Sequence, residues 1–254
     1  MPGRAELFAD AGSLARGVGE RLRHAVREVV DHQGRPFYLA LSGGETPRGI
    51  FRTLAESPFR ESIPWERIRF FWGDERCVGP DHPESNFAQA KRLLLDPLGI
   101  PEGHIFRMRG EDDPEAEVLR YATLLREQVP IGEGGIPRMD CIWLGLGQDG
   151  HTASLFPGNA IKPPDEERIC HPAVHPESGE NRLTLGLSLI KQAGEIWFLV
   201  VGAEKAEVVL DLFDRQGSYR DYPASLVTPR NRSTRVRWLL DREAASGLNQ
   251  EGEP

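Results

Sequence analysis

The chain has 254 residues, a formal net charge of -8 and three cysteines, with 39% hydrophobic and 28% charged residues. This composition supports a large core and argues against global disorder, and the negative charge argues against a general nucleic-acid binder, which would carry a basic stripe. With no disulfide framework, no apolar signal core at the N-terminus and no apolar run long enough to span a bilayer, we expect a cytoplasmic protein without nucleic-acid or membrane partners, as a monomer or a small homo-oligomer.

In the first half of the chain, apolar residues recur at three- and four-residue spacing over about residues 11–31, which predicts an amphipathic helix that ends at Gly34. A continuous apolar run is typical of a strand buried on both faces and occurs at residues 37–41, and the next apolar strand is expected at 68–72. A short strand is also expected at 105–108. Further helices are expected after Pro47, after a capping Ser85, and over about residues 113–128.

In the second half, an apolar run at 139–146 predicts a central strand, and further strands are expected at 182–185, 195–201 and 235–240. Residues 162–168 form a polar, proline-containing excursion, and the tail from about 242 to 254 is polar. Strands and helices alternate throughout. The sequence therefore predicts a single α/β domain over residues 1–254, with a mostly parallel central sheet and helices on both faces.

The stretch after the central strand, GLGQDG at residues 145–150, matches the dinucleotide-binding pattern G-x-G-x-x-G. This pattern normally opens the first strand–helix–strand unit and needs an acidic residue at the end of the next strand. Here it lies past the middle of the chain, and the acidic residues at 165–167 fall in a proline-containing loop. Nicotinamide binding is therefore disfavoured, and the glycines are equally typical of a tight turn.

Asp149 and His151 follow the same strand, and ligands of open α/β sheets bind at the carboxyl ends of strands. An aspartate that accepts from one ring nitrogen would fix the histidine tautomer and leave the other nitrogen as a base. Most histidines are surface residues or satisfied core residues, so spacing alone supports a catalytic and an inert role equally.

Ser42, Gly43, Gly44 and Thr46 lie in SGGETP, between a strand and a helix, a layout that points backbone N–H groups at an anion. No lysine follows directly, so the segment is not a Walker A loop, and a plain helix-capping turn is the alternative.

Asp74 and Arg76, in GDER, offer an acid or base and a fork for phosphate or an oxyanion, unless they only form a strand-end salt bridge. Arg182 and Lys205 lie near strand ends, and they are candidate binding residues only if they share a pocket with residues 42–46. Cys170, His171 and His175 fit no standard zinc spacing, so no metal site is expected. The chain has no G-x-S-x-G elbow for a serine-esterase mechanism.

Taken together, these segments resemble the 6-phosphogluconolactonase family, in the family's order and over about residues 37–240. The matching segments are LSGGETP, WGDERCV, ESNF, GLGQDGHTASLFPG, RLTL, VVGAEKA and YPASL. The segment DGHTASLFPG is the most specific of them.

The resemblance implies a sugar-phosphate isomerase/lactonase type of fold and hydrolysis of 6-phosphoglucono-1,5-lactone to 6-phosphogluconate, with no metal and no organic cofactor. It implies that residues 42–46, Arg182 and Lys205 hold the 6-phosphate. His151 would be the base oriented by Asp149, Arg76 would stabilise the oxyanion or the phosphate, and Asp74 would hold Arg76 or substrate hydroxyls.

Two other functions stay open. Glucosamine-6-phosphate deaminases resemble this chain at the same turns, but Arg76 follows the Asp-Glu pair as in the lactonases, and no acidic residue comes shortly after His151. A catalytically inactive sugar-phosphate sensor is the second alternative, and the intact set of Asp149, His151, Arg76 and Lys205 disfavours it.

Overall fold

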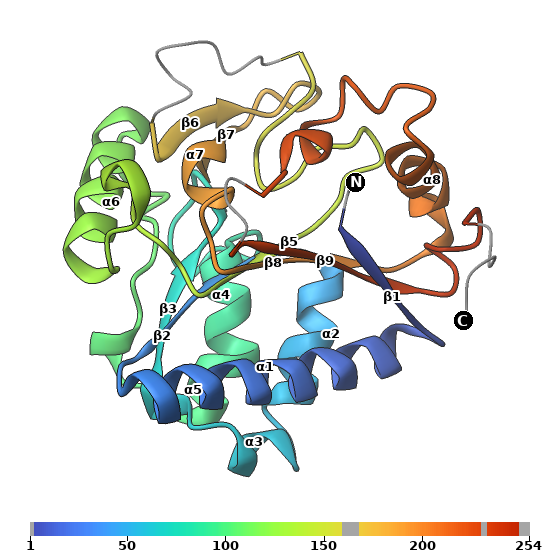
Figure 1. Cartoon of the computed structure of the whole chain (residues 1–254). Helices are drawn as coiled ribbons and strands as arrows, with labels where there is room; N and C mark the ends of the chain where they lie inside the picture. Colours follow the sequence, from blue (N-terminus) through green and yellow to red (C-terminus); the bar gives the residue numbers. More distant parts are fainter. Residues whose placement is uncertain (1–2, 159–167, 230–232, 249–254) are drawn as a thin grey trace.

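A six-stranded parallel sheet forms the centre of the molecule, in a computed structural model that describes residues 3–158, 168–229 and 233–248 (Figure 1). The strand order is β1-β9-β8-β5-β2-β3. The strands are β1 (Arg4–Phe8), β2 (Phe37–Leu41), β3 (Ile68–Trp72), β5 (Cys141–Leu144), β8 (Glu195–Val200) and β9 (Arg235–Asp241). The predicted mostly parallel sheet is confirmed, while nearly all of the predicted excursion at 162–168 and the end of the predicted tail lie outside the described residues.

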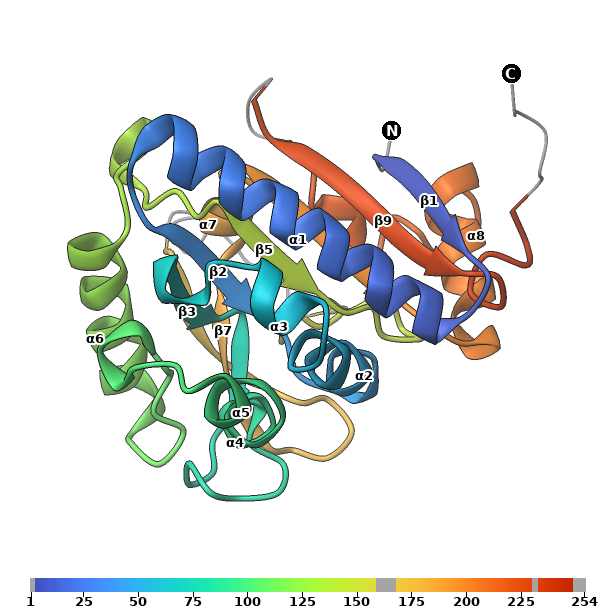
Figure 2. The same cartoon turned by 90° about the horizontal axis from the view of Figure 1, so that it is seen from below.

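Helices cover both faces of this sheet, as predicted. Helices α1 to α5 lie on one face, with α1 running roughly along the strand direction, and α6 to α8 lie on the other (Figures 1 and 2). The helices are α1 (Ala11–Gln33), α2 (Glu45–Leu54), α3 (Phe59–Ser62), α4 (Asn86–Ala90), α5 (Asp96–Leu98), α6 (Pro114–Gln128), α7 (Leu187–Ile190) and α8 (Ala206–Asp214). Helix α1 ends at Gly34 in the left-handed conformation (φ 66°), as its sequence predicts.

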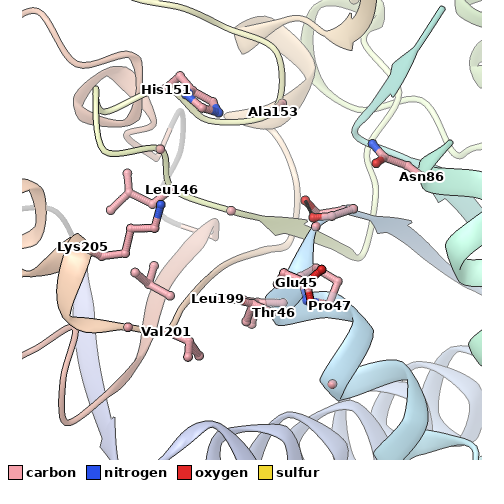
Figure 3. Close-up of a pocket in the computed structure, with 18 of the residues that line it drawn as sticks. Glu45, Thr46, Pro47, Asn86, Leu146, His151, Ala153, Leu199, Val201 and Lys205 are labelled. Atoms are coloured by element: carbon pink, nitrogen blue, oxygen red, sulfur yellow. Dashed lines mark hydrogen bonds between the residues drawn. The ribbon is translucent and has the colours of Figure 1, made fainter. Parts of the chain in front are cut away.

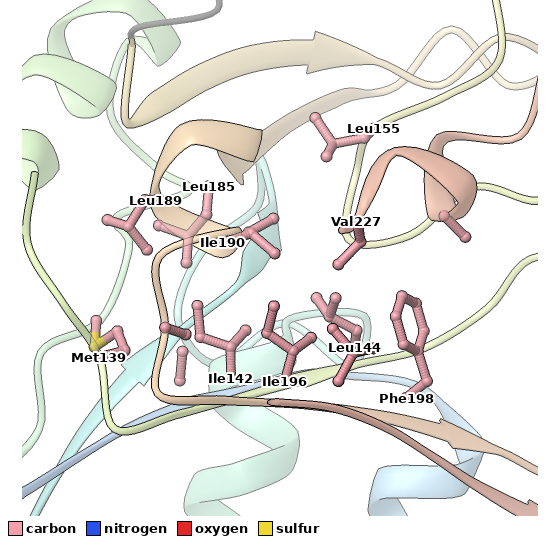
Figure 4. Packing of buried hydrophobic residues seen from close by; sticks show 14 of the residues in the cluster. Met139, Ile142, Leu144, Leu155, Leu185, Leu189, Ile190, Ile196, Phe198 and Val227 are labelled. Carbon is pink, nitrogen blue, oxygen red and sulfur yellow. The ribbon is translucent and has the colours of Figure 1, made fainter. Parts of the chain in front are cut away.

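The central strands bury side chains on both faces, so the sheet separates two hydrophobic cores. On β5 and β8, Trp143 and Trp197 stack on the α1 side with ring centroids 6.2 Å apart. Their neighbours Ile142 and Ile196 point to the other core, against α7 and the loops beyond it (Figure 4). All five tryptophans are buried in one core or the other: Trp65, Trp72, Trp143, Trp197 and Trp238.

A second, three-stranded antiparallel sheet lies beside the carboxyl edge of the first, in the order β4-β7-β6. Its strands are β4 (Asp74–Arg76), β6 (Cys170–Val174) and β7 (Asn181–Leu185). The GDER segment is therefore a strand that continues from β3 past Gly73. The sequence did not predict this sheet, because three polar residues show no periodicity and their partner strand is distant in the chain.

Other local predictions differ from the structure. The strand expected at 105–108 is wrong: only a single bridge joins Ile105 to Phe70. Strand β1 was not predicted, because its alternation is interrupted by charged residues. The prediction that Ser85 caps a helix is confirmed, since its hydroxyl accepts the Ala88 N–H at 3.1 Å, but α4 continues as a π-helical stretch (Lys91–Leu95) before α5. None of the described helices has both the length and the apolar character to cross a membrane.

Candidate active site

A cavity of about 560 Å³, the site cavity, opens at the carboxyl edge of the parallel sheet (Figure 3). Its wall combines the ends of β2, β4, β5 and β8 with the first turn of α2 and the segment before α8. Eight of the ten predicted site residues line it: Ser42, Gly43, Gly44, Thr46, Asp74, Arg76, His151 and Lys205. Segments distant in the sequence therefore converge, as the predicted strand ends require.

His151 lines the site cavity with its ring held by Asp149. The distance from His151 Nδ1 to the Asp149 carboxylate is 2.6 Å, and the same carboxylate accepts the His151 backbone N–H at 3.1 Å. With Nδ1 donating to Asp149, Nε2 carries the lone pair. The His151 side chain is about one-third exposed, and its ring packs on Phe156 with the ring centroids 5.1 Å apart. This arrangement is the one that a positioned general base requires.

The turn before His151 explains why these two residues meet. The Gly147 N–H donates to the His151 carbonyl at 2.8 Å, which closes the loop after β5. A Cβ on Gly147 would lie 2.1 Å from His151 Nδ1, so a side chain there would displace the ring. The Thr152 hydroxyl anchors the loop to the Gly145 carbonyl at 2.8 Å. The glycines thus shape the turn that brings Asp149 and His151 together.

The glycine turn, residues 42–46, leads from β2 into α2. Helix α2 has no side-chain cap at its N-cap residue Gly44, so the N–H groups of Glu45 and Thr46 begin the helix without one. The Gly44 N–H itself donates to Gln89 Oε1 at 3.3 Å. An uncapped helix N-terminus beside a cavity favours a bound anion, because its amides and the helix dipole both present positive charge.

Asp74 is buried, and no hydrogen bond or ion pair joins it to Arg76 in the described part of the chain, which favours the substrate hydroxyls as its partner. Its carboxylate accepts the Ser154 hydroxyl at 2.9 Å and the Asn86 side-chain amide at 3.2 Å. Both partners sit in segments that the sequence singled out, TASLFPG and ESNF, but the pattern gave no signal that they meet Asp74. The carboxylate is therefore fixed at the cavity wall by two neutral donors.

Three predicted cations have different surroundings. Lys205, the residue before α8, forms no ion pair with any described residue and faces the site cavity (Figure 3). Arg76 also lines the cavity, and its guanidinium donates to the Glu84 carbonyl. Arg182 does not line the cavity and is paired with Glu180 at 2.7 Å. Because Arg182 lies directly opposite Arg76 in the β4–β7 register, the two side chains project to the same face.

Glu75, next to Asp74, is buried and binds the start of α4. Its carboxylate accepts the N–H groups of Asn86 at 2.7 Å and Phe87 at 2.8 Å and the Ser85 hydroxyl at 3.0 Å. Burial raises the pKa of Glu75, and these donors oppose that rise. This residue is an anchor for α4 and is separate from the cavity wall.

The cysteine and histidines of residues 170–175 form no metal-ligand set in the part of the chain that the structure describes. Cys170 is buried, and burial raises the pKa of its thiol, while the ring of His175 packs against Phe156 at 5.0 Å. In the described part of the chain, no group of three or more His, Cys, Asp or Glu residues is arranged to hold a metal ion.

Residues 9–238 match the family model described as glucosamine-6-phosphate isomerases/6-phosphogluconolactonase. The chain is 41% identical over 228 residues to the 6-phosphogluconolactonase of Haemophilus influenzae, covering 87% of this chain and 94% of that protein. It is 38% identical over 232 residues to the corresponding protein of Aggregatibacter actinomycetemcomitans, covering 89% and 96%. Among solved structures, the 6-phosphogluconolactonase of Trypanosoma brucei superposes with a TM-score of 0.85 at 28% identity, covering 97% of this chain and 99% of that one.

Proposed function

This chain belongs to the glucosamine-6-phosphate isomerase/6-phosphogluconolactonase family, and from that membership we propose that it hydrolyses 6-phosphoglucono-1,5-lactone to 6-phosphogluconate. It is a carboxylic ester hydrolase whose substrate is a phosphorylated sugar lactone, and its reaction belongs to the oxidative pentose phosphate pathway. The observation that carries the mechanism is the His151 ring, held by Asp149 at 2.6 Å on the wall of a cavity that also contains an uncapped helix N-terminus.

Substrate binding begins with the 6-phosphate, which we assign to the glycine turn and Lys205. The amides of Glu45 and Thr46 donate to phosphate oxygens, and the Lys205 ammonium supplies a charge that no described carboxylate neutralises. Arg182 lies beside Arg76 across the β4–β7 pair and is paired with Glu180, so we assign it no direct contact with the phosphate. Anchoring the phosphate in this way brings the lactone carbonyl to His151.

The chemical step uses His151 as a general base. Nε2 takes a proton from water, and the water oxygen attacks C1 of the lactone. Asp149 stabilises the imidazolium that forms, as in other paired acid–imidazole sites. Arg76 stabilises the negative charge that develops on the carbonyl oxygen. The C1–O5 bond then breaks, and His151 returns its proton to the ring oxygen.

A lactone is an activated ester, so this mechanism needs no covalent intermediate. One positioned general base contributes about 10²–10⁴-fold in rate. Asp74, fixed by Asn86 and Ser154 at the cavity wall, orients the substrate hydroxyls. No step is assigned to a serine, which agrees with the missing nucleophile elbow.

The direct test measures proton release in a pH-stat with freshly prepared 6-phosphogluconolactone, after subtraction of the spontaneous rate. We expect hydrolysis far above that rate. Hydrolysis no faster than the uncatalysed reaction would refute the proposal. Ammonia release from glucosamine 6-phosphate would instead indicate the deaminase activity, and binding without turnover would indicate a sensor.

We also place the protein in the cytoplasm, as a monomer or a small homo-oligomer. The three cysteines support a reducing compartment, since Cys77, Cys141 and Cys170 are all free thiols. Cell fractionation tests the location, and light scattering coupled to size-exclusion chromatography tests the oligomeric state.

A further inference from the structure

Helix α4 packs against the glycine turn, and its first residue, Asn86, also reaches the wall of the site cavity. Two of its buried side chains, one helical turn apart, contact the two glycines of the turn. Gln89 Oε1 accepts the Gly44 N–H at 3.3 Å. Asn86 Oδ1 lies over Gly43, where an added Cβ would come within 1.7 Å of it. The turn is therefore seated on α4 by both contacts.

The same helix is joined to the strand that carries Asp74. The Asn86 amide donates to the Asp74 carbonyl at 2.9 Å and to its carboxylate at 3.2 Å. Glu75 accepts the first N–H groups of α4, so the helix cannot shift without breaking contacts to β4. The glycine turn and Asp74 consequently share one rigid support.

Gln89 differs from Asn86 because it does not line the site cavity. It is 3% exposed, and its side-chain carbonyl contacts the Gly44 N–H without lining the site cavity. Gly44 has φ 102° and is the N-cap of α2, so its orientation sets the direction of the following amides. Without the acceptor, the Gly44 N–H would be left without its partner, and the turn would relax to satisfy it.

We propose that Gln89 is a positioning residue that holds the glycine turn with the amides of Glu45 and Thr46 directed into the site cavity, and thereby sets the preference for phosphorylated over unphosphorylated lactones. The proposal rests on the proposed function, because it assigns the phosphate to this turn. Gln89 touches neither the phosphate nor the reacting atoms, so its effect is expected on substrate binding and not on the chemical step.

The test compares two substrates, 6-phosphogluconolactone and glucono-1,5-lactone, in Gln89→Met, which removes the acceptor at similar volume. The KM for the phosphorylated lactone should rise about two- to tenfold, the worth of one neutral hydrogen bond. The kcat and the KM for the unphosphorylated lactone should stay unchanged. Gln89→Asn, which withdraws the acceptor by one methylene, should show the same pattern. Calorimetric titration with inorganic phosphate should show weaker binding to both variants.

The matched control is Gln192→Met. Gln192 is also buried, and its amide donates to the carbonyls of Glu133 and Ile136, both at 3.0 Å, far from the glycine turn. This variant should lose stability without changing the preference between the two lactones.

Gln89 variants that fold and keep both the wild-type KM ratio and the phosphate affinity would overturn the proposal, as would an equal loss for both lactones. If the wild-type protein hydrolyses no lactone, the proposed function fails. The phosphate titration would then still decide whether Gln89 positions the turn.

Discussion

Two cavities of similar size lie at opposite ends of the parallel sheet. The site cavity, of about 560 Å³, is at the carboxyl ends of the strands, and the opposite cavity, of about 600 Å³, is at their amino ends. The opposite cavity is far richer in basic side chains. Five arginines line it: Arg21, Arg35, Arg138, Arg235 and Arg237. By volume and charge alone, it would be the better candidate for binding a phosphate.

The difference lies in what the charges already contact. In the opposite cavity, Arg35 makes a two-pronged pair with Asp140, both contacts at 2.7 Å, and Arg237 pairs with Glu195 at 3.1 Å and Glu6 at 3.3 Å. In the site cavity, Lys205 has no such partner among the described residues, and α2 begins without a side-chain cap. A binding site thus depends on positive groups that remain available, and paired arginines mainly hold the fold together.

The largest effect should come from His151→Ala. We expect kcat to fall about 10²–10⁴-fold, because the general base is lost. The fold should be intact, since the ring is partly exposed. Steady-state kinetics with 6-phosphogluconolactone measure this loss. His24→Ala, which removes an exposed histidine of the opposite cavity, is the control and should keep full activity. Near wild-type activity of His151→Ala would sink the assignment of the base.

Lys205→Ala should raise the KM for 6-phosphogluconolactone about tenfold to a hundredfold, the worth of a charge-assisted hydrogen bond. The KM for glucono-1,5-lactone should change little. The matched variant Arg138→Ala removes a cation from the opposite cavity and should alter neither value. An equal loss of affinity for both lactones in Lys205→Ala would mean that Lys205 does not bind the phosphate.

Asp140→Asn tests the structural role of the opposite cavity. The Asp140 carboxylate pairs with Arg35 and also accepts the Tyr38 N–H at 2.9 Å, so its loss of charge should lower the free energy of unfolding by about 1–3 kcal/mol. Urea denaturation monitors this change. The kinetic constants should be those of the wild type. A lowered kcat at unchanged stability would show that the ion pairs of the opposite cavity act in catalysis and do not mainly hold the fold together.

The smallest effect concerns ligand stabilisation. At ten times its Kd, 6-phosphogluconate should stabilise the wild-type protein by about 1.4 kcal/mol, and Tm should rise by a few degrees. Lys205→Ala should lose most of this rise at the same concentration. Arg235→Ala, in the opposite cavity, should keep it. A rise that depends on Arg235 and not on Lys205 would move the phosphate to the other end of the sheet.

The sequence predicts those parts of the fold and the site that depend on neighbouring residues. Strands β2 and β3 begin and end where their apolar runs do, because both faces are buried. Asp149 and His151 are two residues apart in a glycine-rich turn, so their contact is local, and the strand-turn-helix pattern of residues 42–46 is local too. The convergence of these turns follows from the rule that parallel strands share one edge.

Contacts between distant segments were not predictable in this way. Asp74 meets Ser154 eighty residues away, and β7 joins the two, since Thr184 pairs with Asp74 and its hydroxyl accepts the Ser154 N–H at 3.3 Å. Arg182 is expected at the phosphate from the sequence, which gives no sign that the same pairing puts it beside Arg76 with its guanidinium on Glu180. The role of Gln89 depends on how α4 packs under the turn, and its own segment carries no signal of it.

The burial of all five tryptophans has a spectroscopic consequence. Their indoles lie in the two cores, and none lines the site cavity. The intrinsic fluorescence of the protein therefore reports the integrity of its interior and not the occupancy of its active site. An emission red shift will mark global unfolding, whereas lactone or product binding will pass unseen unless an indole is introduced at the cavity wall.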